Sequence, residues 1–308
     1  MGTSMNTGAR CLGGSAPEIQ GLLMFDEPMA LHTSFRIGGP ADIFAVPSGV
    51  PDLQALRRWA NAESVPFFVL GAGTNVLVAD RGIRGLVVQL GSGFDKVRIK
   101  GCELRTGGAA RLSRAVRKSL GSGLCGLEGL VGIPGSVSGA ICMNAGTPAG
   151  CIKDTLASVT AMDADGVLRE LSASDLGLRY RGSMVPGSGL IILEAVFNLR
   201  REGPTDVDGI VKALLFSRRR TQPVGVGTAG SVFKNPPGRY AGQVLEAIGA
   251  KGMQVGGARV SSKHANFIEN TGLATAVDVH ELMMILQRRV MDEFGIALEP
   301  EIQLVGEW

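Results

Sequence analysis

The segment from Val131 to Gly146, VGIPGSVSGAICMNAG, constrains the fold more than any other part of the chain. Glycine carries no Cβ, so backbone N–H groups in a glycine-rich segment can approach a ligand closely. Successive exposed N–H groups form a concavity that suits a phosphate or pyrophosphate. The apolar residues between the glycines could line a flat ring system. Glycines recur here at Gly132, Gly135, Gly139 and Gly146, together with Pro134 and Asn144.

A second glycine loop, Gly71-Ala72-Gly73-Thr74-Asn75, directly follows the apolar run Phe67–Leu70. It fails the GxGxxG dinucleotide pattern because Val76 occupies the last glycine position, and a strand-like run follows where that pattern requires a helix. A tight turn between two strands therefore remains an alternative for this loop. Together, the two glycine segments favour a long, phosphate-bearing cofactor held in more than one place.

Composition excludes several classes of protein. The chain has 308 residues, 45% of them hydrophobic and 19% charged, which indicates a globular protein of two or three domains. A net charge of +3 is too mild to predict nucleic-acid binding. The sequence contains no run of 18 apolar residues, so it does not predict a transmembrane helix. Residues 1–21 lack the apolar core of a signal peptide, so we expect a disordered leader and a cytoplasmic protein.

Cysteine and histidine usage predicts neither a disulfide framework nor a metal site. The cysteines number five and form no CxxC pair, and the histidines number three and lie far apart in the sequence. The densest basic cluster is Arg218-Arg219-Arg220, at the end of a predicted helix. Its cations either complement that helix C-terminus or contact an anionic substrate or cofactor.

Hydrophobic periodicity predicts an α+β protein. Apolar residues recur at helical spacing in four segments: 51–62, 111–120, 207–220 and 279–290. Asp165-Gly166 is a hairpin signal between two strand-like runs, and the charged segment 200–204 is a plausible domain boundary. The strand-like runs are 67–70, 76–79, 86–90, 97–99, 156–162, 167–171 and 191–199.

An ordered set of motifs resembles the UDP-N-acetylenolpyruvoylglucosamine reductase family. Any one of these motifs would be weak evidence, but the set in this order is specific, and it covers the chain from about residue 24 to the C-terminus. The motifs are HTSFRIGGPAD at 32–42, GAGTNVLV at 71–78, GIPGSVSGA at 132–140, MNAG at 143–146, YRGS at 180–183, GSVFKNP at 230–236, KHANFI at 263–268 and LEPEI at 298–302.

The resemblance implies a vanillyl-alcohol-oxidase-like (PCMH-type) FAD-binding fold of two α+β subdomains, followed by a C-terminal α+β domain that covers the substrate. It places FAD-binding subdomain 1 at residues 22–90, FAD-binding subdomain 2 at 91–200 and the substrate-binding domain at 201–308. The short passage from Arg181 to the helix at 207–220 resembles the shorter type of the family, which lacks an extra tyrosine-bearing loop.

The activity that the resemblance implies is the NADPH-dependent reduction of the enolpyruvyl group of UDP-N-acetylenolpyruvoylglucosamine to UDP-N-acetylmuramate, a peptidoglycan precursor. The redox group is a non-covalently held FAD, and the protein supplies position and charge. The implied FAD-binding residues are Gly71, Ala72, Gly73, Thr74, Asn75, Gly132, Ile133, Pro134, Gly135, Ser136, Gly139, Asn144 and Gly146.

Three residues match the catalytic positions of the family. Arg181 would stabilise the negative charge that hydride addition places on the substrate carboxylate. Ser231 matches the proton donor to carbon, and Glu301 matches the third catalytic residue. A glutamate beside a negatively charged intermediate should have a raised pKa. Asn235 matches a substrate contact of the family, and Lys234 beside it, Tyr180 beside Arg181, His264 and Asn266 are further candidates for substrate binding. A structural role remains an alternative for His264, since a lone histidine is more often a structural residue.

Two departures and two alternatives stand beside this interpretation. Ser138 occupies a usual glycine position of the family, and Thr147-Pro148 follows MNAG where an aromatic residue is common. The first alternative is a sugar or alcohol oxidase of the same fold, against which the SVFKNP and LEPE motifs argue. The second is a catalytically inactive nucleotide-sugar-binding protein, against which the joint retention of Arg181, Ser231 and Glu301 argues. We expect a monomer without nucleic-acid, membrane or metal partners.

Overall fold

The computed structural model describes residues 16–201 and 207–308, which form two compact units. Unit 1 comprises the described residues up to Glu27 together with Ala41–Ala72 and Gly85–Leu214. Unit 2 comprises Pro28–Pro40, Gly73–Arg84 and Leu215–Trp308. The units are therefore not consecutive pieces of the sequence, because two N-terminal segments group with the C-terminal third of the chain.

Unit 1 contains a four-stranded sheet in the order β1-β2-β5-β3, formed by Leu22–Pro28, Pro40–Val46, Ile83–Val88 and Phe67–Val69. The neighbours β3 and β5 are parallel. Helix α1 (Val50–Ala62) has a proline in its first turn, which suits a helix start. Its buried residues Leu53, Leu56 and Ala60 recur at helical spacing and share a core cluster with Leu86.

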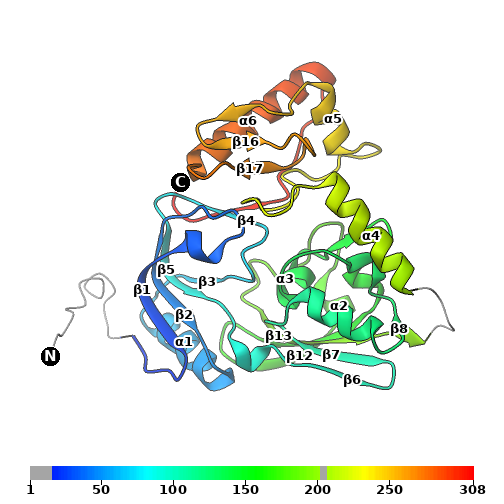
Figure 1. Ribbon diagram of the computed structural model, residues 1–308. Helices are drawn as coiled ribbons and strands as arrows, with labels where there is room; N and C mark the ends of the chain where they lie inside the picture. Colours follow the sequence, from blue (N-terminus) through cyan, green and yellow to red (C-terminus); the bar gives the residue numbers. More distant parts are fainter. Residues whose placement is uncertain (1–15, 202–206) are drawn as a thin grey trace. The chain divides into compact units, whose positions relative to one another are not determined.

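A five-stranded sheet in the order β12-β11-β13-β7-β6 forms the second layer of unit 1. Every neighbouring pair in it is antiparallel. Helices α2 (Leu112–Leu120) and α3 (Val137–Cys142) cover one face of this sheet (Figure 1). The strands are β6 (Val97–Lys100), β7 (Glu103–Gly107), β11 (Leu156–Met162), β12 (Leu168–Ser172) and β13 (Ile191–Asn198).

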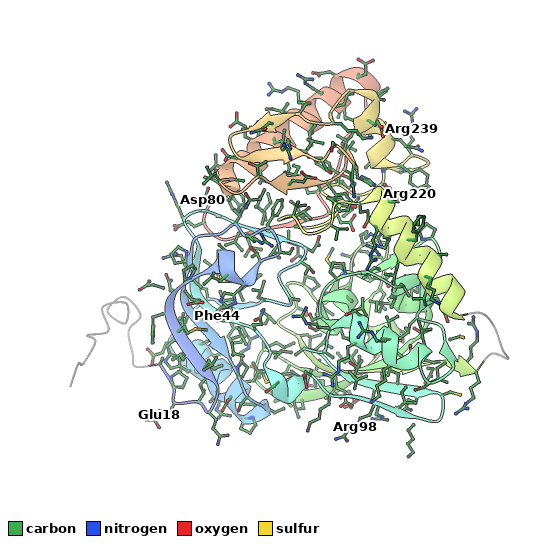
Figure 2. The ribbon with its side chains drawn as sticks, viewed as in Figure 1. Glu18, Phe44, Asp80, Arg98, Arg220 and Arg239 are labelled. Carbon is green, nitrogen blue, oxygen red and sulfur yellow. The ribbon has the colours of Figure 1, made fainter. Side chains whose placement is uncertain are left out.

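Side chains from both sheets of unit 1 share one core cluster, in which Ile43 and Leu86 of the first sheet join Met162 and Ile191 of the second. Phe44, labelled in Figure 2, is fully buried in β2. The polar side of α1 adds a second connection, because Arg57 Nε donates to the carbonyl oxygen of Ala164 over 3.0 Å. The glycine loop that begins at Gly71 follows β3 of this packed pair of sheets.

Unit 2 is built on the three-stranded antiparallel sheet β15-β16-β17 (Gln254–Val255, Ala258–Val260, Ile268–Asn270). Helix α6 (Ala276–Phe294) packs against this sheet, and α5 (Ala241–Ala247) packs against α6 (Figure 1). A parallel pair joins β4 (Val76–Val78) to β18 (Gln303–Val305). This pairing explains why residues 73–84 belong with the C-terminal part of the chain.

The start of α6 is capped from two directions. Thr275 and Asp278 form a capping box. The carboxylate of Asp80, labelled in Figure 2, accepts the backbone N–H groups of Ala276 at 2.8 Å and Val277 at 3.1 Å. Two anionic side chains therefore satisfy donors that the first helical turn leaves without partners.

The structure confirms the four helices and the strand-like runs that periodicity predicts. The predicted helices are α1, α2, α4 (Val207–Thr221) and α6, and Arg218–Arg220 lie in the last turn of α4. The hairpin at Asp165-Gly166 joins β11 to β12, with Gly166 at φ 81°. Elements that periodicity did not reveal are α3, α5, β1, β2, β7, β8 (Leu124–Cys125), β9 (Gly146–Thr147), β10 (Gly150–Cys151), β14 (Arg200–Arg201), β15, β16, β17 and β18.

Two predicted boundaries fall partly outside the described residues. Residues 1–15 of the leader predicted at 1–21 lie outside the described residues. Near the end of that leader, the backbone N–H groups of Gln20 and Gly21 donate to the carboxylate of Asp52. In the boundary predicted at 200–204, Arg200 and Arg201 form β14 and pair with β8, and residues 202–204 lie outside. The chain is thus anchored to α1 just before β1 begins.

Candidate active site

The loop Gly71–Asn75 presents a row of backbone donors. Among the residues that the structure describes, the N–H groups of residues 71–75 donate to no acceptor. The loop is held through its carbonyl oxygens instead: Gln89 Nε2 donates to Gly71 O in unit 1, and Ser34 N donates to Gly73 O in unit 2. Such a row of exposed donors can accept an anion.

Within unit 1, the two glycine segments lie together. A Cβ added at Gly71 would lie 2.9 Å from Ser136 Oγ and 3.7 Å from Gly139 Cα. The N–H groups of Gly135 and Ser136 also donate to no acceptor within the described residues. The close approach of the loops and their unused donors fit a phosphate-bearing cofactor such as FAD. These residues were all predicted from the sequence as FAD contacts.

The departure at Ser138 is compatible with this backbone. Ser138 lies in the first turn of α3, and its N–H donates to Gly108 O over 2.9 Å. Gly135, three residues earlier, has φ 120°, a conformation that favours glycine, whereas Ser138 is not among the residues with positive φ. A serine therefore replaces the usual glycine without backbone strain. Ser136 caps α3 by accepting the N–H of Gly139.

Asn144 and Gly146 are fixed by contacts within the protein. Asn144 is 6% exposed, and its side-chain amide bonds to backbone groups of Arg179 and Lys153. A Cβ at Gly146 would lie 2.4 Å from the Cβ of Cys151, so only glycine fits there. Of the other predicted FAD contacts in this segment, Gly132 has φ 74°, while Ile133 donates its N–H to Leu130 O. The half-buried side chain of Ile133 packs against the core of unit 1. Pro134 is the next residue in the chain.

Arg181 lies in a tight turn of unit 1. Arg179 and Gly182 exchange backbone hydrogen bonds, so Tyr180 and Arg181 form the two central positions of a turn. Arg181 has φ 52°, which is uncommon for a residue other than glycine. Its guanidinium carbon lies 5.1 Å from the centre of the Tyr180 ring, which is 56% exposed. Strained backbone of this kind often occurs at functional sites.

Unit 2 brings Ser231 and Glu301 together. The segment that begins at Ser231 lies between two others, because Ser231 bridges Phe267 on one side and Phe233 bridges Pro300 on the other. The N–H of Glu301 donates to Val232 O over 2.7 Å. The Ser231 side chain is half-buried, and its hydroxyl has no hydrogen-bond partner in the described part of the chain. A hydroxyl held in this way is available to a ligand.

Lys234 and Asn235 continue the same segment, but both side chains are engaged. Lys234 Nζ lies 3.1 Å from a carboxylate oxygen of Glu299, which is 73% exposed. Asn235 Oδ1 accepts the N–H of Ala241, the first residue of α5. An exposed ion pair of this kind contributes little to stability, so Lys234 can exchange its partner for an anionic ligand.

His264 and Asn266 support the Ser231 segment. Both polar atoms of the Asn266 side chain bond to the backbone of Phe233, and Asn266 is 3% exposed. His264 Nδ1 accepts the N–H of Asn266, and its ring packs 4.9 Å from that of Phe267. Burial lowers the pKa of His264, and nearby Lys251 lowers it further, against an opposing effect of Glu246. The geometry gives both residues a structural part beside the site.

Ser34 and Asn75 are positioning residues whose roles the sequence did not reveal. Ser34 Oγ donates to Thr228 O over 2.7 Å, and Ser34 N binds Gly73 O. Asn75 was predicted as a FAD contact, yet its Nδ2 donates to Glu301 O over 3.1 Å. The HTSFRIGG motif that contains Ser34 was the only signal available for the first of these roles.

The described residues offer neither a metal site nor a membrane-spanning helix. No three of their histidine, cysteine, aspartate and glutamate side chains lie where they could hold a metal ion. Within 16–201 and 207–308, no helix has the length and apolarity needed to cross a membrane. The described cysteines, Cys102, Cys125, Cys142 and Cys151, form no disulfide with one another.

Comparisons with known proteins identify the domains and the family of the chain. Residues 41–172 match the model of an FAD binding domain, which confirms the predicted flavin-binding fold. Residues 222–305 match the C-terminal domain of UDP-N-acetylenolpyruvoylglucosamine reductase. The chain is 41% identical to the enzyme of that name from Agathobacter rectalis, over 93% of this chain and 95% of that protein. It is 43% identical to the one from an Anaeromyxobacter species, over 94% and 91%.

A solved structure gives the same result. The crystal structure of UDP-N-acetylenolpyruvylglucosamine reductase from Thermus caldophilus matches with a TM-score of 0.80 and 34% identity. The match covers 94% of this chain and 100% of that one. With this extent of similarity, and with both domain models matched in order, the chain belongs to the UDP-N-acetylenolpyruvoylglucosamine reductase family, the oxidoreductases of peptidoglycan precursor synthesis.

Proposed function

We propose that this reductase holds FAD non-covalently, takes its reducing equivalents from NADPH and converts UDP-N-acetylenolpyruvoylglucosamine into UDP-N-acetylmuramate. The observation that carries the proposal is that, in unit 2, the N–H of Glu301 donates to the carbonyl oxygen of Val232, the residue next to Ser231, whose hydroxyl has no hydrogen-bond partner in the described residues. A proton donor and a carboxyl group are the two groups that must act after hydride addition to an enol ether. The family assignment supplies the substrate class.

The glycine segments supply the proposed FAD contacts. In unit 1, the unused N–H groups of Gly71, Ala72, Gly135 and Ser136 suit the pyrophosphate, because Gly71 lies against Ser136 and Gly139 without a side chain of its own. The unused N–H groups of residues 73–75 continue the same loop. Gly132, Ile133, Pro134 and Gly139 are proposed to contact the flavin portion. FAD, when bound, accepts hydride from NADPH and delivers it to the vinyl carbon of the substrate.

Arg181 stabilises the charge that hydride addition creates. As hydride reaches the vinyl carbon, electron density moves toward the neighbouring carboxylate of the substrate. A planar guanidinium can bind a carboxylate through two parallel hydrogen bonds and remains charged at all relevant pH values. The turn that holds Arg181 fixes its backbone before substrate arrives, as electrostatic stabilisation requires.

Ser231 donates the proton that completes the reaction at the carbon next to the carboxylate. A serine hydroxyl is a weak acid, so it must be positioned and supported by its surroundings. Two neighbouring segments fix the Ser231 backbone. Glu301, in its protonated form, donates a hydrogen bond to the intermediate.

Polar residues near Ser231 and Arg181 are proposed to hold the rest of the substrate. Lys234 leaves its exposed ion pair with Glu299 to bind the diphosphate. Tyr180, exposed beside Arg181, contacts the sugar or diphosphate. Asn235 presents its side-chain amide nitrogen, since its oxygen is used by Ala241. His264 and Asn266 support these residues from the protein side, because both side chains form hydrogen bonds with backbone groups.

Product analysis tests this proposal. The purified protein, NADPH and the enolpyruvyl substrate should yield a product heavier by two hydrogen atoms, with one NADPH oxidised per product and no oxygen consumed. Oxygen consumption without this product would favour the oxidase alternative. Binding of the substrate without turnover would favour the inactive nucleotide-sugar-binding alternative. We further propose that the enzyme works as a monomer in the cytoplasm, which sedimentation and cell fractionation test.

A further inference from the structure

We propose that Asn144 is a positioning residue for Arg181, and that its side chain acts on the reaction through the Arg179–Gly182 turn instead of through FAD. This inference rests on the proposed role of Arg181. The sequence placed Asn144 among the FAD contacts, because it lies in the MNAG motif beside the glycine segment. The structure shows that its amide is occupied by the protein.

The contacts of Asn144 lead directly to the turn. Its Nδ2 donates to Arg179 O over 3.0 Å, and Arg179 is the first residue of the turn whose third residue is Arg181. Its Oδ1 accepts the N–H of Lys153 over 3.0 Å. With 6% exposure, the side chain has little remaining surface for a ligand. A buried amide with both ends paired is rigid.

The Arg179–Gly182 turn needs such a support. A positive φ at Arg181 costs free energy that neighbouring contacts must offset. The turn is exposed at Tyr180, so burial of its own side chains supplies little restraint. A second hydrogen bond holds the residue that follows the turn, since Ser183 Oγ donates to Cys142 O over 2.8 Å. These two hydrogen bonds join residues 142–144 to the segment 179–183 that contains the turn.

The backbone conformation at position 144 also favours asparagine. Its φ is 41°, a left-handed conformation that asparagine and aspartate adopt more readily than other residues with a Cβ. Asn144→Asp therefore keeps the backbone preference and the acceptor for Lys153 N–H. The variant loses only the donor to Arg179 O and places a carboxylate oxygen against that carbonyl. Alanine would add backbone strain and is a poorer test.

The first readout needs no turnover. Hydrogen exchange of the backbone amides between Leu176 and Pro186 should be faster in Asn144→Asp, because the hydrogen bonds of Arg179, Gly182 and Met184 lose their support. Asn61→Asp is the matched control, since Asn61 also donates to a backbone carbonyl of unit 1, that of Ala164. The control should leave this exchange unchanged. Unchanged exchange in Asn144→Asp as well would overturn the proposal.

The second readout separates the two half-reactions. In Asn144→Asp, FAD affinity and flavin reduction by NADPH should stay within about threefold of wild type. Reoxidation by the enolpyruvyl substrate should fall roughly 100-fold, the usual cost of misplacing a reacting group by about 1 Å. Loss of FAD, or equal loss in both half-reactions, would overturn the proposal in favour of a direct flavin contact.

A double variant shows whether the effect passes through Arg181. In an Arg181→Ala background, Asn144→Asp should slow reoxidation no further, because the residue on which it acts is gone. An additive loss would overturn the proposal. Failure of the proposed function is distinguishable, since the wild-type protein would then not be reoxidised by the enolpyruvyl substrate at all, whereas the exchange readout would still report on the turn.

Discussion

The side-chain amide of Asn75 donates to the carbonyl oxygen of Glu301 over 3.1 Å. This bond connects the glycine loop that we propose to bind FAD with the residue that we propose to donate a hydrogen bond to the reaction intermediate. Glu301 is held a second time by the bond from its N–H to Val232 O, next to Ser231. Asn75, Ser231 and Glu301 of unit 2 thus share one backbone framework.

Ser231→Ala should affect only the second half-reaction. The hydroxyl has no protein partner in the described residues, so its removal costs little stability. Flavin reduction by NADPH should stay near the wild-type rate, while reoxidation by substrate falls roughly 100- to 10,000-fold, the range for a lost general acid. Stopped-flow absorbance measures both steps. Equal impairment of the two steps would reject Ser231 as the proton donor.

Glu301→Gln should retain more activity than Glu301→Ala. Glutamine can still donate a hydrogen bond to the intermediate, as a protonated glutamate does, whereas alanine cannot. Both variants keep the backbone bonds to Val232 and Asn75. The rate of reoxidation by substrate is the measurement. Equal losses would show that Glu301 must exchange a proton, and not merely donate a hydrogen bond.

Asp80→Ala should destabilise unit 2 by about 1 kcal/mol, the usual cost of losing a helix N-cap. The Asp80 carboxylate accepts the N–H groups of Ala276 and Val277 at the start of α6. Asp292→Ala removes an exposed carboxylate of the same helix and serves as the control. Urea unfolding followed by circular dichroism compares the two. A loss no greater than in the control would mean that Thr275 and Asp278 cap α6 without help.

Asp52 should make stability depend on pH in the acid range. Burial raises its pKa, but bonds from Ser48 N and Oγ, Gln20 N and Gly21 N outweigh this and hold the pKa below its ordinary value of 3.8. A lowered carboxylate pKa gives stability that is present above pH 3.8 and is lost as the pH falls through the folded value.

The variant Asp52→Asn isolates this effect, because the amide keeps the shape and loses the charge. The difference in unfolding free energy between wild type and variant should be constant near pH 7 and should shrink below about pH 4. Urea titrations between those values measure it. A difference that does not change with pH would show that the Asp52 charge adds nothing to its hydrogen bonds.

Local patterns predicted the longer helices and strands such as β11 and β13, because their apolar residues follow the period of the element, but they missed β1 and β2. Leu53 and Leu56 mark α1 in this way, and Gly166 marks the hairpin between β11 and β12. The six residues of α3 were missed because they contain glycine and lie within a segment that composition assigns to a loop. Nor does any local signal reveal that β4 pairs with β18.

The candidate site was predictable as a set of motifs but not as a set of contacts. The sequence named Ser231 and Glu301, whereas their shared backbone framework depends on pairing between distant segments. It also grouped Asn144 and Asn266 with the ligand contacts, although the structure shows both amides bonded to backbone groups. A motif shows which residue type stands at a position. Only the three-dimensional structure shows whether that side chain is bonded to a neighbouring segment or left available to a ligand.

The most direct test is an anaerobic absorbance spectrum of the purified protein, before and after NADPH and then after the enolpyruvyl substrate. We expect a yellow protein that bleaches with NADPH and regains its colour when that substrate is added. Bleached protein that regains colour only with oxygen, or protein that is colourless and takes up no FAD, would contradict it.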